Sequence, residues 1–311
     1  MRWSIRSIFD WRLWVAAALG TGIILELSLR LLLDFPLYGA DNEVGYFVLP
    51  DQHGSYLGVN DWSFNAQGMG VSEDYRPGAG MDVLLIGDSL VFGGNPVDQA
   101  ERLGPLIEQR TGWETWPISA GSWALQNELA YLARYPEAVG TADAIVFVVN
   151  SKDFAKPSSW ASQYTHPLAK PQIYLLYLFG KLLPGDQARS PERLTVHPWP
   201  NLAGKWRDFV RQSKAPVVVV AYPHLPEVGG DCEWLPAWMA QGARTACYGS
   251  DGTVRVSSYL DDIHPDTEGR RALAAFIEEQ VKSVMQSRWG LKRGFVDQHP
   301  SRREPSSRRT E

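Results

Sequence analysis

The sequence predicts an α/β fold built around a parallel β-sheet. Runs of consecutive apolar residues, mostly valine, isoleucine and leucine, are typical of strands that are covered on both faces. Three such runs cover residues 83–86, 144–149 and 216–221, and a further strand is expected at 114–118. The stretch 270–285 has apolar residues at helical spacing and is expected to be the closing helix of the domain.

The amino-terminal residues 1–34 predict one membrane-spanning helix. An apolar segment at 13–33 is interrupted only by Glu26 and Arg30, which can form an ion pair one turn apart. Its length of 21 residues reaches the roughly 20 that a span needs. Arginines before it predict an inside amino terminus and an exported carboxy-terminal part. A cleaved signal peptide and a buried amphipathic helix are the alternatives, but no A-x-A-like site follows before Asp34.

The rest of the chain divides by composition. Residues 35–80 are rich in Gly, Asn and Asp and are expected to be a linker or an edge segment. Residues 81–287 then form the folded domain, with an insertion at about 154–205. Within the insertion, 173–179 is apolar but too short to span a membrane; it could be a lid, a membrane-facing helix or, the favoured interpretation, a core helix. Residues 288–311 are rich in Ser, Arg and Pro and are predicted to be a disordered polar tail.

Composition excludes some classes of function. The net charge is −5 although the tail is basic, so the remainder is more acidic still, which argues against a nucleic-acid partner. The chain has two cysteines, Cys232 and Cys247, which could form a disulfide in an oxidising compartment or remain as two buried thiols. No clustered His and Cys residues have metal-ligand spacing, so neither a metal nor another cofactor is expected.

The first apolar run ends in Gly87-Asp88-Ser89-Leu90. Gly87 permits a sharp exit from the strand, and Ser89 would then lie at the start of a helix, close to unpaired backbone N–H groups. A serine in that position is a candidate nucleophile. The alternative is that Asp88 or Ser89 only caps the next helix.

A possible base for this serine lies near the other end of the chain. A hydroxyl needs a base to become a nucleophile at neutral pH, and the base needs a carboxylate to fix its tautomer. Asp261 and His264 are three residues apart, so one turn can hold both, and Pro265 can open the helix that follows. Together with Ser89, this pair favours a catalytic triad over a structural His-Pro turn.

With these motifs the chain resembles the SGNH (GDSL-type) hydrolases, a family of serine esterases and acyltransferases. The resemblance covers roughly residues 80–285 and implies a flavodoxin-like three-layer α/β/α sandwich with a central parallel sheet. It also implies that Ser89 is the nucleophile, His264 the base and Asp261 the carboxylate. The Gly-x-Ser-x-Gly pentapeptide of the α/β-hydrolases does not occur in the sequence.

The resemblance also implies an oxyanion hole formed by the backbone N–H groups of Ser89 and Gly121. This sequence departs from the family's third motif, Gly-x-Asn-Asp. Residues 150–153 read Asn-Ser-Lys-Asp, which puts Lys152 where the family has asparagine. In the family that asparagine donates a third hydrogen bond, and removing such a donor costs on the order of 2.7–4 kcal/mol of transition-state stabilisation. Lys152 or Asn150 could replace it, or the hole could have two donors.

Two further residues are candidate substrate contacts. Trp123 lies just beyond Gly121, and His224 follows the strand at 216–221, where ligands gather in open α/β sheets. Core packing of Trp123 and a structural role for His224 are the alternatives.

The sequence therefore predicts a serine ester hydrolase that removes O-acyl groups, acetyl above all, from an extracytoplasmic glycan; a different small ester is a possible substrate. The glycan is an analogy to anchored family members. Alternatives are an O-acetyltransferase of an exported polysaccharide and a non-catalytic glycan-binding or scaffold protein. The expected location is a bacterial-type inner (plasma) membrane, with a single span and a periplasmic catalytic domain.

Overall fold

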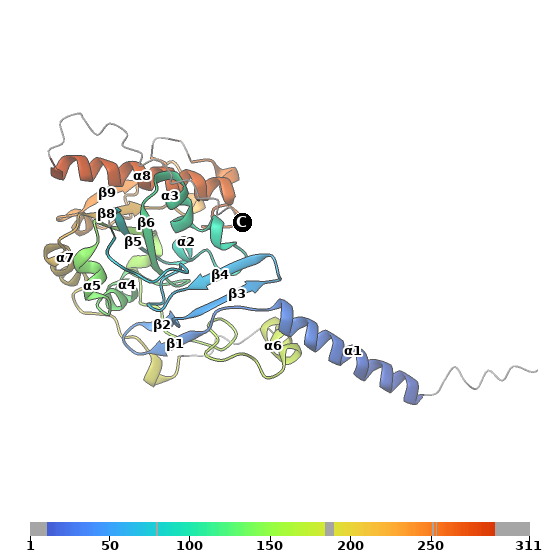
Figure 1. Cartoon of the computed structure of the whole chain (residues 1–311). Helices are drawn as coiled ribbons and strands as arrows, with labels where there is room; N and C mark the ends of the chain where they lie inside the picture. The colour runs from blue at the N-terminus through green and yellow to red at the C-terminus, as the bar shows by residue number, and fades with distance from the viewer. Residues whose placement is uncertain (1–10, 79, 184–189, 251, 253, 290–311) are drawn as a thin grey trace, which may run out of the picture.

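A five-stranded, all-parallel sheet forms the centre of the protein in the computed structural model, which describes residues 11–78, 80–183, 190–250, 252 and 254–289 (Figure 1). Its strands are β5 (Asp82–Gly87), β6 (Glu114–Ser119), β7 (Ala144–Val149), β8 (Val217–Ala221) and β9 (Arg244–Cys247). They are ordered β6-β5-β7-β8-β9. Counted along the chain this is the order 2-1-3-4-5, which defines the flavodoxin-like arrangement. The strand order reverses between β5 and β7.

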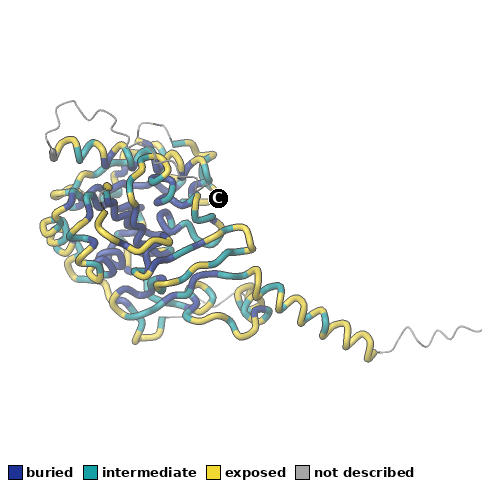
Figure 2. The backbone as a smooth tube through the Cα atoms, in the orientation of Figure 1, coloured by how far each residue is buried: buried dark blue, intermediate teal, exposed yellow. Residues whose placement is uncertain are grey.

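Helices cover both faces of the sheet. One face carries α4 (Leu125–Leu132), α5 (Pro136–Thr141) and α7 (Leu202–Gln212), and the other carries α2 (Ser89–Phe92), α3 (Leu103–Thr111) and α8 (Thr267–Trp289). Successive residues of β5 point to opposite faces, so Leu84 packs in the first core and Val83 in the second. Figure 2 shows that the buried backbone is concentrated in these strands. The predicted three-layer α/β/α fold is confirmed.

Residues 35–78, part of the stretch expected to be a linker or an edge segment, are folded against the domain. They form two antiparallel hairpins, β1 (Tyr38–Asp41) with β2 (Gly45–Val48) and β3 (Gln52–Tyr56) with β4 (Asn60–Phe64). Aromatic side chains of these strands are buried in the core on the α4 face; they include Tyr46, Trp62 and Phe64. The strands are only four or five residues long. The residues of the turns between them therefore dominate the composition of the segment, and the sequence gives no clear strand pattern.

Two helices stand apart from the layers. The amino-terminal helix α1 (Trp11–Leu32) has no buried residue and is long and apolar enough to cross a membrane, although a signal sequence would meet the same criteria. The insertion contains α6 (Tyr174–Leu182), of which only Tyr174 is buried. The favoured interpretation of this segment as a core helix is therefore wrong, since most of its large apolar side chains are exposed.

Six short 3-10 helices complete the described part of the chain: Gln99–Glu101, Ser151–Phe154, Glu192–Leu194, Leu225–Glu227, Ala237–Ala240 and Val256–Ser258. Helix α8 continues to Trp289, slightly beyond the predicted end of the domain. The expected polar tail otherwise lies outside the described residues.

Candidate active site

Ser89 is held at the carboxyl end of strand β5, where α2 begins. Asp88 caps this helix, because its Oδ1 accepts a hydrogen bond of 2.9 Å from the backbone N–H of Leu90. Gly87 allows the turn to pack closely, since a Cβ there would lie 2.7 Å from the side chain of Val91 and 3.0 Å from the carbonyl oxygen of Val148. Asp88 thus caps the helix, which leaves the hydroxyl of Ser89 available to another partner.

The structure brings Ser89, His264 and Asp261 together in a hydrogen-bonded chain, which we call the triad. The Ser89 Oγ lies 2.8 Å from His264 Nε2, and His264 Nδ1 lies 2.7 Å from Asp261 Oδ2. With a proton on Nδ1 directed at the carboxylate, Nε2 is free to accept the hydroxyl proton of Ser89.

Asp261 is held as an ionised acceptor. Its Oδ1 accepts the backbone N–H groups of Ile263 at 2.9 Å and His264 at 2.8 Å. Partial burial acts to raise the pKa of Asp261, but these backbone hydrogen bonds and the His264 side chain outweigh it and lower the pKa to about 2. The carboxylate therefore remains charged at neutral pH and can fix the orientation of the imidazole.

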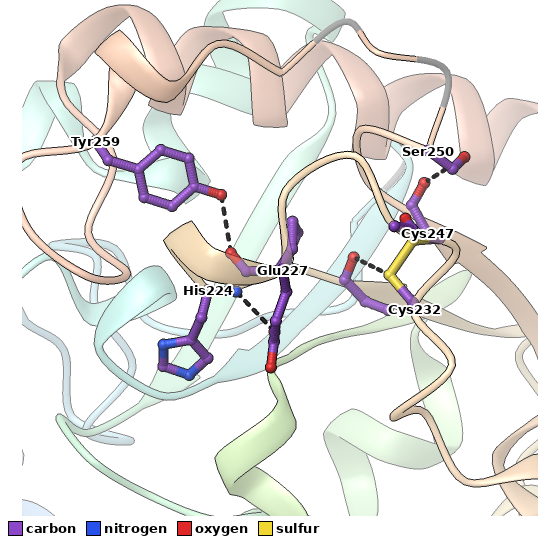
Figure 3. The surroundings of a disulfide bond; sticks show 9 residues. His224, Glu227, Cys232, Cys247, Ser250 and Tyr259 are labelled. Carbon is purple, nitrogen blue, oxygen red and sulfur yellow. Dashed lines mark hydrogen bonds between the residues drawn. A yellow bond between two sulfur atoms is a disulfide. The ribbon is translucent and has the colours of Figure 1, made fainter.

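The turn that carries this pair is fastened to the segment following β8. The Tyr259 hydroxyl donates to the carbonyl oxygen of Pro223 at 2.8 Å, and the backbone N–H of Leu225 donates to the carbonyl oxygen of Asp262 at 2.8 Å. Further along the same segment, Cys232 is bonded to Cys247 at the end of β9 (Figure 3). The disulfide thus lies on the segment that supports the triad turn.

Gly121 lies in the loop after β6, and a tyrosine of the amino-terminal hairpin β1–β2 holds this loop in place. Its carbonyl oxygen accepts a hydrogen bond of 2.6 Å from the hydroxyl of Tyr46 in β2. The next residue, Ser122, has a φ of 63°, which is uncommon for a residue other than glycine, and its carbonyl oxygen accepts from the hydroxyl of Ser158. A Cβ at Gly121 would meet no atom within 4 Å, so the space beside it is open.

Asn150 does not have a free donor for an oxyanion. Its amide nitrogen donates to Asp88 Oδ2 at 3.1 Å and to Asp153 Oδ1 at 3.0 Å, and its Oδ1 accepts the backbone N–H of Lys152 at 2.9 Å. Both amide hydrogens are therefore used, and the side chain is buried. The expectation that Asn150 replaces the family asparagine is wrong; the residue instead joins the ends of β5 and β7. Lys152 is exposed and stays a candidate.

The two candidate substrate contacts are buried. Trp123 is 2% exposed, and its indole N–H donates to the carbonyl oxygen of Tyr46 at 2.8 Å, so no ring face is open to a sugar. His224 is 6% exposed, and its Nε2 lies 3.2 Å from Asn150 Oδ1; Figure 3 shows its position after β8. Both interpretations as substrate contacts are therefore wrong. Trp123 packs in the core, and His224 contacts Asn150, which joins the ends of β5 and β7.

Three buried carboxyl groups lie behind the nucleophile. Burial raises the pKa of Asp88 to about 6 and raises the pKa values of Glu128 and Asp153 well above the usual range, and mutual repulsion adds to the increase for Glu128 and Asp153. Neither carboxyl oxygen of Glu128 has a hydrogen-bond partner among the described residues. No group of His, Cys, Asp and Glu in the described chain could hold a metal ion.

Tyr46 and His166 were missed by the sequence analysis. The His166 ring stacks on that of Tyr46 with centroids 3.7 Å apart. Burial lowers the pKa of His166 to about 4, against the opposite effect of a hydrogen bond with the Gly121 backbone, so the ring is neutral at pH 7. The short apolar segment from Val44 to Val48 could have indicated the buried strand. No sequence signal connected either residue to Gly121.

No protein-family model and no curated protein matches the sequence. Solved structures similar to this chain include a protein assigned to the lipolytic G-D-S-L family from Desulfitobacterium hafniense, with 12% identity and a TM-score of 0.40 over 64% of this chain and 99% of that one. An acetyl xylan esterase from Butyrivibrio proteoclasticus has 12% identity and a TM-score of 0.39, over 68% of this chain and 66% of that one. A family two carbohydrate esterase from Cellvibrio japonicus has 12% identity and a TM-score of 0.39, over 66% and 62%.

Proposed function

We propose that this chain is a serine ester hydrolase of the SGNH (GDSL) type. The observation that carries the proposal is the hydrogen-bonded triad, with 2.8 Å between Ser89 and His264 and 2.7 Å between His264 and Asp261. A nucleophile within reach of a base, and a base oriented by a third group, is the arrangement that activates a hydroxyl for acyl transfer.

In the proposed reaction the Ser89 Oγ attacks the carbonyl carbon of an ester while His264 Nε2 takes its proton. The backbone N–H groups of Ser89 and Gly121 donate to the developing oxyanion, and the Lys152 ammonium supplies the third donor. His264 then gives its proton to the leaving alcohol, which departs as the acyl-enzyme forms. Water, deprotonated by His264, attacks the acyl group and releases the acid and free Ser89.

The openness of the site favours water as acyl acceptor and a polymer as substrate. The side chains of His264 and Asp261 are 42% and 56% exposed. We therefore propose O-acyl groups on a glycan, acetyl in particular, as the substrate class.

The proposed location is a bacterial-type inner membrane, with α1 retained as a single span and the catalytic domain on the periplasmic side. Retention is supported by contacts between α1 and the domain. The Glu26 carboxylate accepts hydrogen bonds from the backbone N–H groups of Tyr174 and Leu175, each at 2.9 Å. The backbone N–H of Leu57 donates to the carbonyl oxygen of Leu32 at 2.6 Å. Cleavage of a signal peptide would remove these partners. The disulfide supports an oxidising compartment.

The function is tested with purified full-length protein in detergent micelles, using p-nitrophenyl acetate and an acetylated oligosaccharide. Ser89→Ala is expected to lower kcat to background, on the order of 10⁶-fold in well-developed triads, whereas Ser287→Ala on the exposed side of α8 is expected to leave it unchanged. Equal turnover by wild type and a folded Ser89→Ala variant would exclude the hydrolase. Acetyl transfer to added oligosaccharide exceeding hydrolysis would assign the triad to a transferase instead.

A further inference from the structure

Helix α6 exposes an apolar surface that the domain leaves uncovered. Its only charged residue is Lys181, and its large side chains, with those at its two ends, are exposed to between 36% and 74%: Ile173, Leu176, Leu178, Phe179, Leu182 and Leu183. A soluble protein rarely leaves such a contiguous apolar surface in water, because exposing it costs free energy in proportion to its area.

This helix is attached directly to α1. Both carboxylate oxygens of Glu26 accept backbone N–H groups at the start of α6, from Tyr174 and Leu175. Arg30 pairs with Glu26 at 2.9 Å, and its guanidinium lies 5.4 Å from the centre of the Tyr174 ring. The two charged residues of the apolar amino-terminal segment therefore serve to hold α6.

The attachment point gives the depth of α6 relative to the end of α1. Glu26 lies six residues before Leu32, the last residue of α1, which is about 9 Å at the helical rise of 1.5 Å per residue. Amphipathic helices bury their apolar side about 5–10 Å into the boundary between lipid headgroups and acyl chains. If α1 spans a membrane with its carboxyl end at the surface, α6 begins at that depth.

The tip of the β3–β4 hairpin also meets the end of α1. The backbone N–H of Leu57 donates to the carbonyl oxygen of Leu32, and Leu33 pairs with Tyr56. The side chains of Leu57 and Val59 at this tip are 46% and 69% exposed. Figure 1 shows the hairpin tip and α6 at the same end of the domain, where α1 joins it.

We infer that the exposed side chains of α6 and of the hairpin tip form an apolar collar around the end of α1 that inserts into the outer boundary of the lipid bilayer. The inference rests on the proposed anchoring by α1. A bilayer is favoured over a protein partner because the collar continues the surface of α1, none of whose residues is buried in the protein. Lys170, which pairs with Asp34 at 2.6 Å, lies where the chain leaves α1, as expected for a basic residue at a headgroup layer.

The collar makes the domain a rigid attachment to the membrane. Only five residues separate the end of α1 from the start of β1, and the contacts of Glu26 and Leu32 fix α1 to α6 and to the hairpin. The domain therefore keeps one tilt relative to the bilayer, and the triad keeps a constant orientation relative to the membrane surface.

The test uses the full chain in vesicles of phosphatidylethanolamine and phosphatidylglycerol. Both native cysteines form the disulfide, so single cysteines can be introduced and labelled with a fluorophore that doxyl-labelled lipids quench. The positions are Ile24→Cys in α1, Val59→Cys and Phe179→Cys in the collar, and Val256→Cys as control; all four native side chains are between 62% and 69% exposed.

We expect lipid-dependent loss of fluorescence at Ile24, Val59 and Phe179 and none at Val256. Doxyl groups near the headgroup are expected to quench the collar labels more than deep ones. Quenching at Ile24 with Val59 and Phe179 as unaffected as Val256 would overturn the collar and leave the anchor intact. Loss of quenching at Ile24 itself would refute the anchor, and the collar with it.

Discussion

Replacing Asp261 with asparagine tests the proposed triad through a single proton. The carboxylate uses Oδ1 to accept two backbone N–H groups and Oδ2 to accept His264 Nδ1. An asparagine must keep its oxygen at the Oδ1 position, because an NH₂ group there could not accept the hydrogen bonds that the backbone N–H groups of Ile263 and His264 donate. Its NH₂ group then takes the Oδ2 position and donates to His264 Nδ1.

This reversal moves the imidazole proton to Nε2, which faces Ser89 Oγ at 2.8 Å. In that tautomer Nε2 cannot accept the hydroxyl proton. The expected loss in kcat for Asp261→Asn is about 10⁴-fold, equivalent to about 5 kcal/mol of activation free energy. The geometry around the turn should remain unchanged, because all backbone hydrogen bonds to Oδ1 are kept.

The assay is p-nitrophenyl acetate hydrolysis by the full chain in detergent, with circular dichroism to verify folding. Asp262→Asn is the matched control, since Asp262 is the adjacent carboxylate and its side chain is exposed. Its kcat is expected to stay at the wild-type level. A folded Asp261→Asn variant that retains more than about a tenth of wild-type kcat would refute the tautomer argument.

Three other predictions concern the surroundings of the triad. Lys152→Met should lower kcat on the order of 10²-fold or more if the ammonium binds the oxyanion, with Lys156→Met as the exposed control; an unchanged kcat would leave only backbone donors. Burial raises the pKa of Glu128 in the folded state. As pH rises above about 4.3, the unfolded chain therefore loses the Glu128 proton while the folded protein keeps it, and the free energy of unfolding falls by up to about 1.4 kcal/mol per pH unit. Urea unfolding should therefore show that the stability of Glu128→Gln relative to wild type is greater at pH 8 than at pH 5, and a pH-independent difference would contradict this. Replacing Cys232 and Cys247 together by serine should lower the stability by about 3 kcal/mol, since the bond closes a loop with a sequence separation of 15; an unshifted unfolding midpoint would argue otherwise.

The parallel sheet and the position of Ser89 could be predicted because both depend on local sequence. The apolar run 144–149 coincides with β7, and 216–221 includes all of β8. A strand covered on both faces must be apolar throughout, so the signal is continuous. Asp261 and His264 could be predicted for a related reason, since residues three apart share one turn whatever the rest of the fold does.

What could not be predicted depends on contacts between distant segments. Tyr46 and Gly121 are 75 residues apart and meet through a hydroxyl and a carbonyl oxygen, which leaves no periodic pattern. The role of Asn150 was misjudged because nothing in the sequence indicates that both amide hydrogens bond to Asp88 and Asp153. Similarly, the apolar segment in α6 has the composition of a core helix, and only the fold reveals that its side chains remain uncovered.

The hydrogen bond from Tyr46 to Gly121 has a practical consequence for making soluble forms of this protein. The motifs alone suggest a fragment starting near residue 80, just before β5. Such a fragment would lack the residue that fixes the loop beside the nucleophile, and would expose the core surface that Trp62 and Phe64 cover. An expression boundary should instead fall before β1, so that the shortest piece of this chain expected to keep the candidate site intact includes both amino-terminal hairpins.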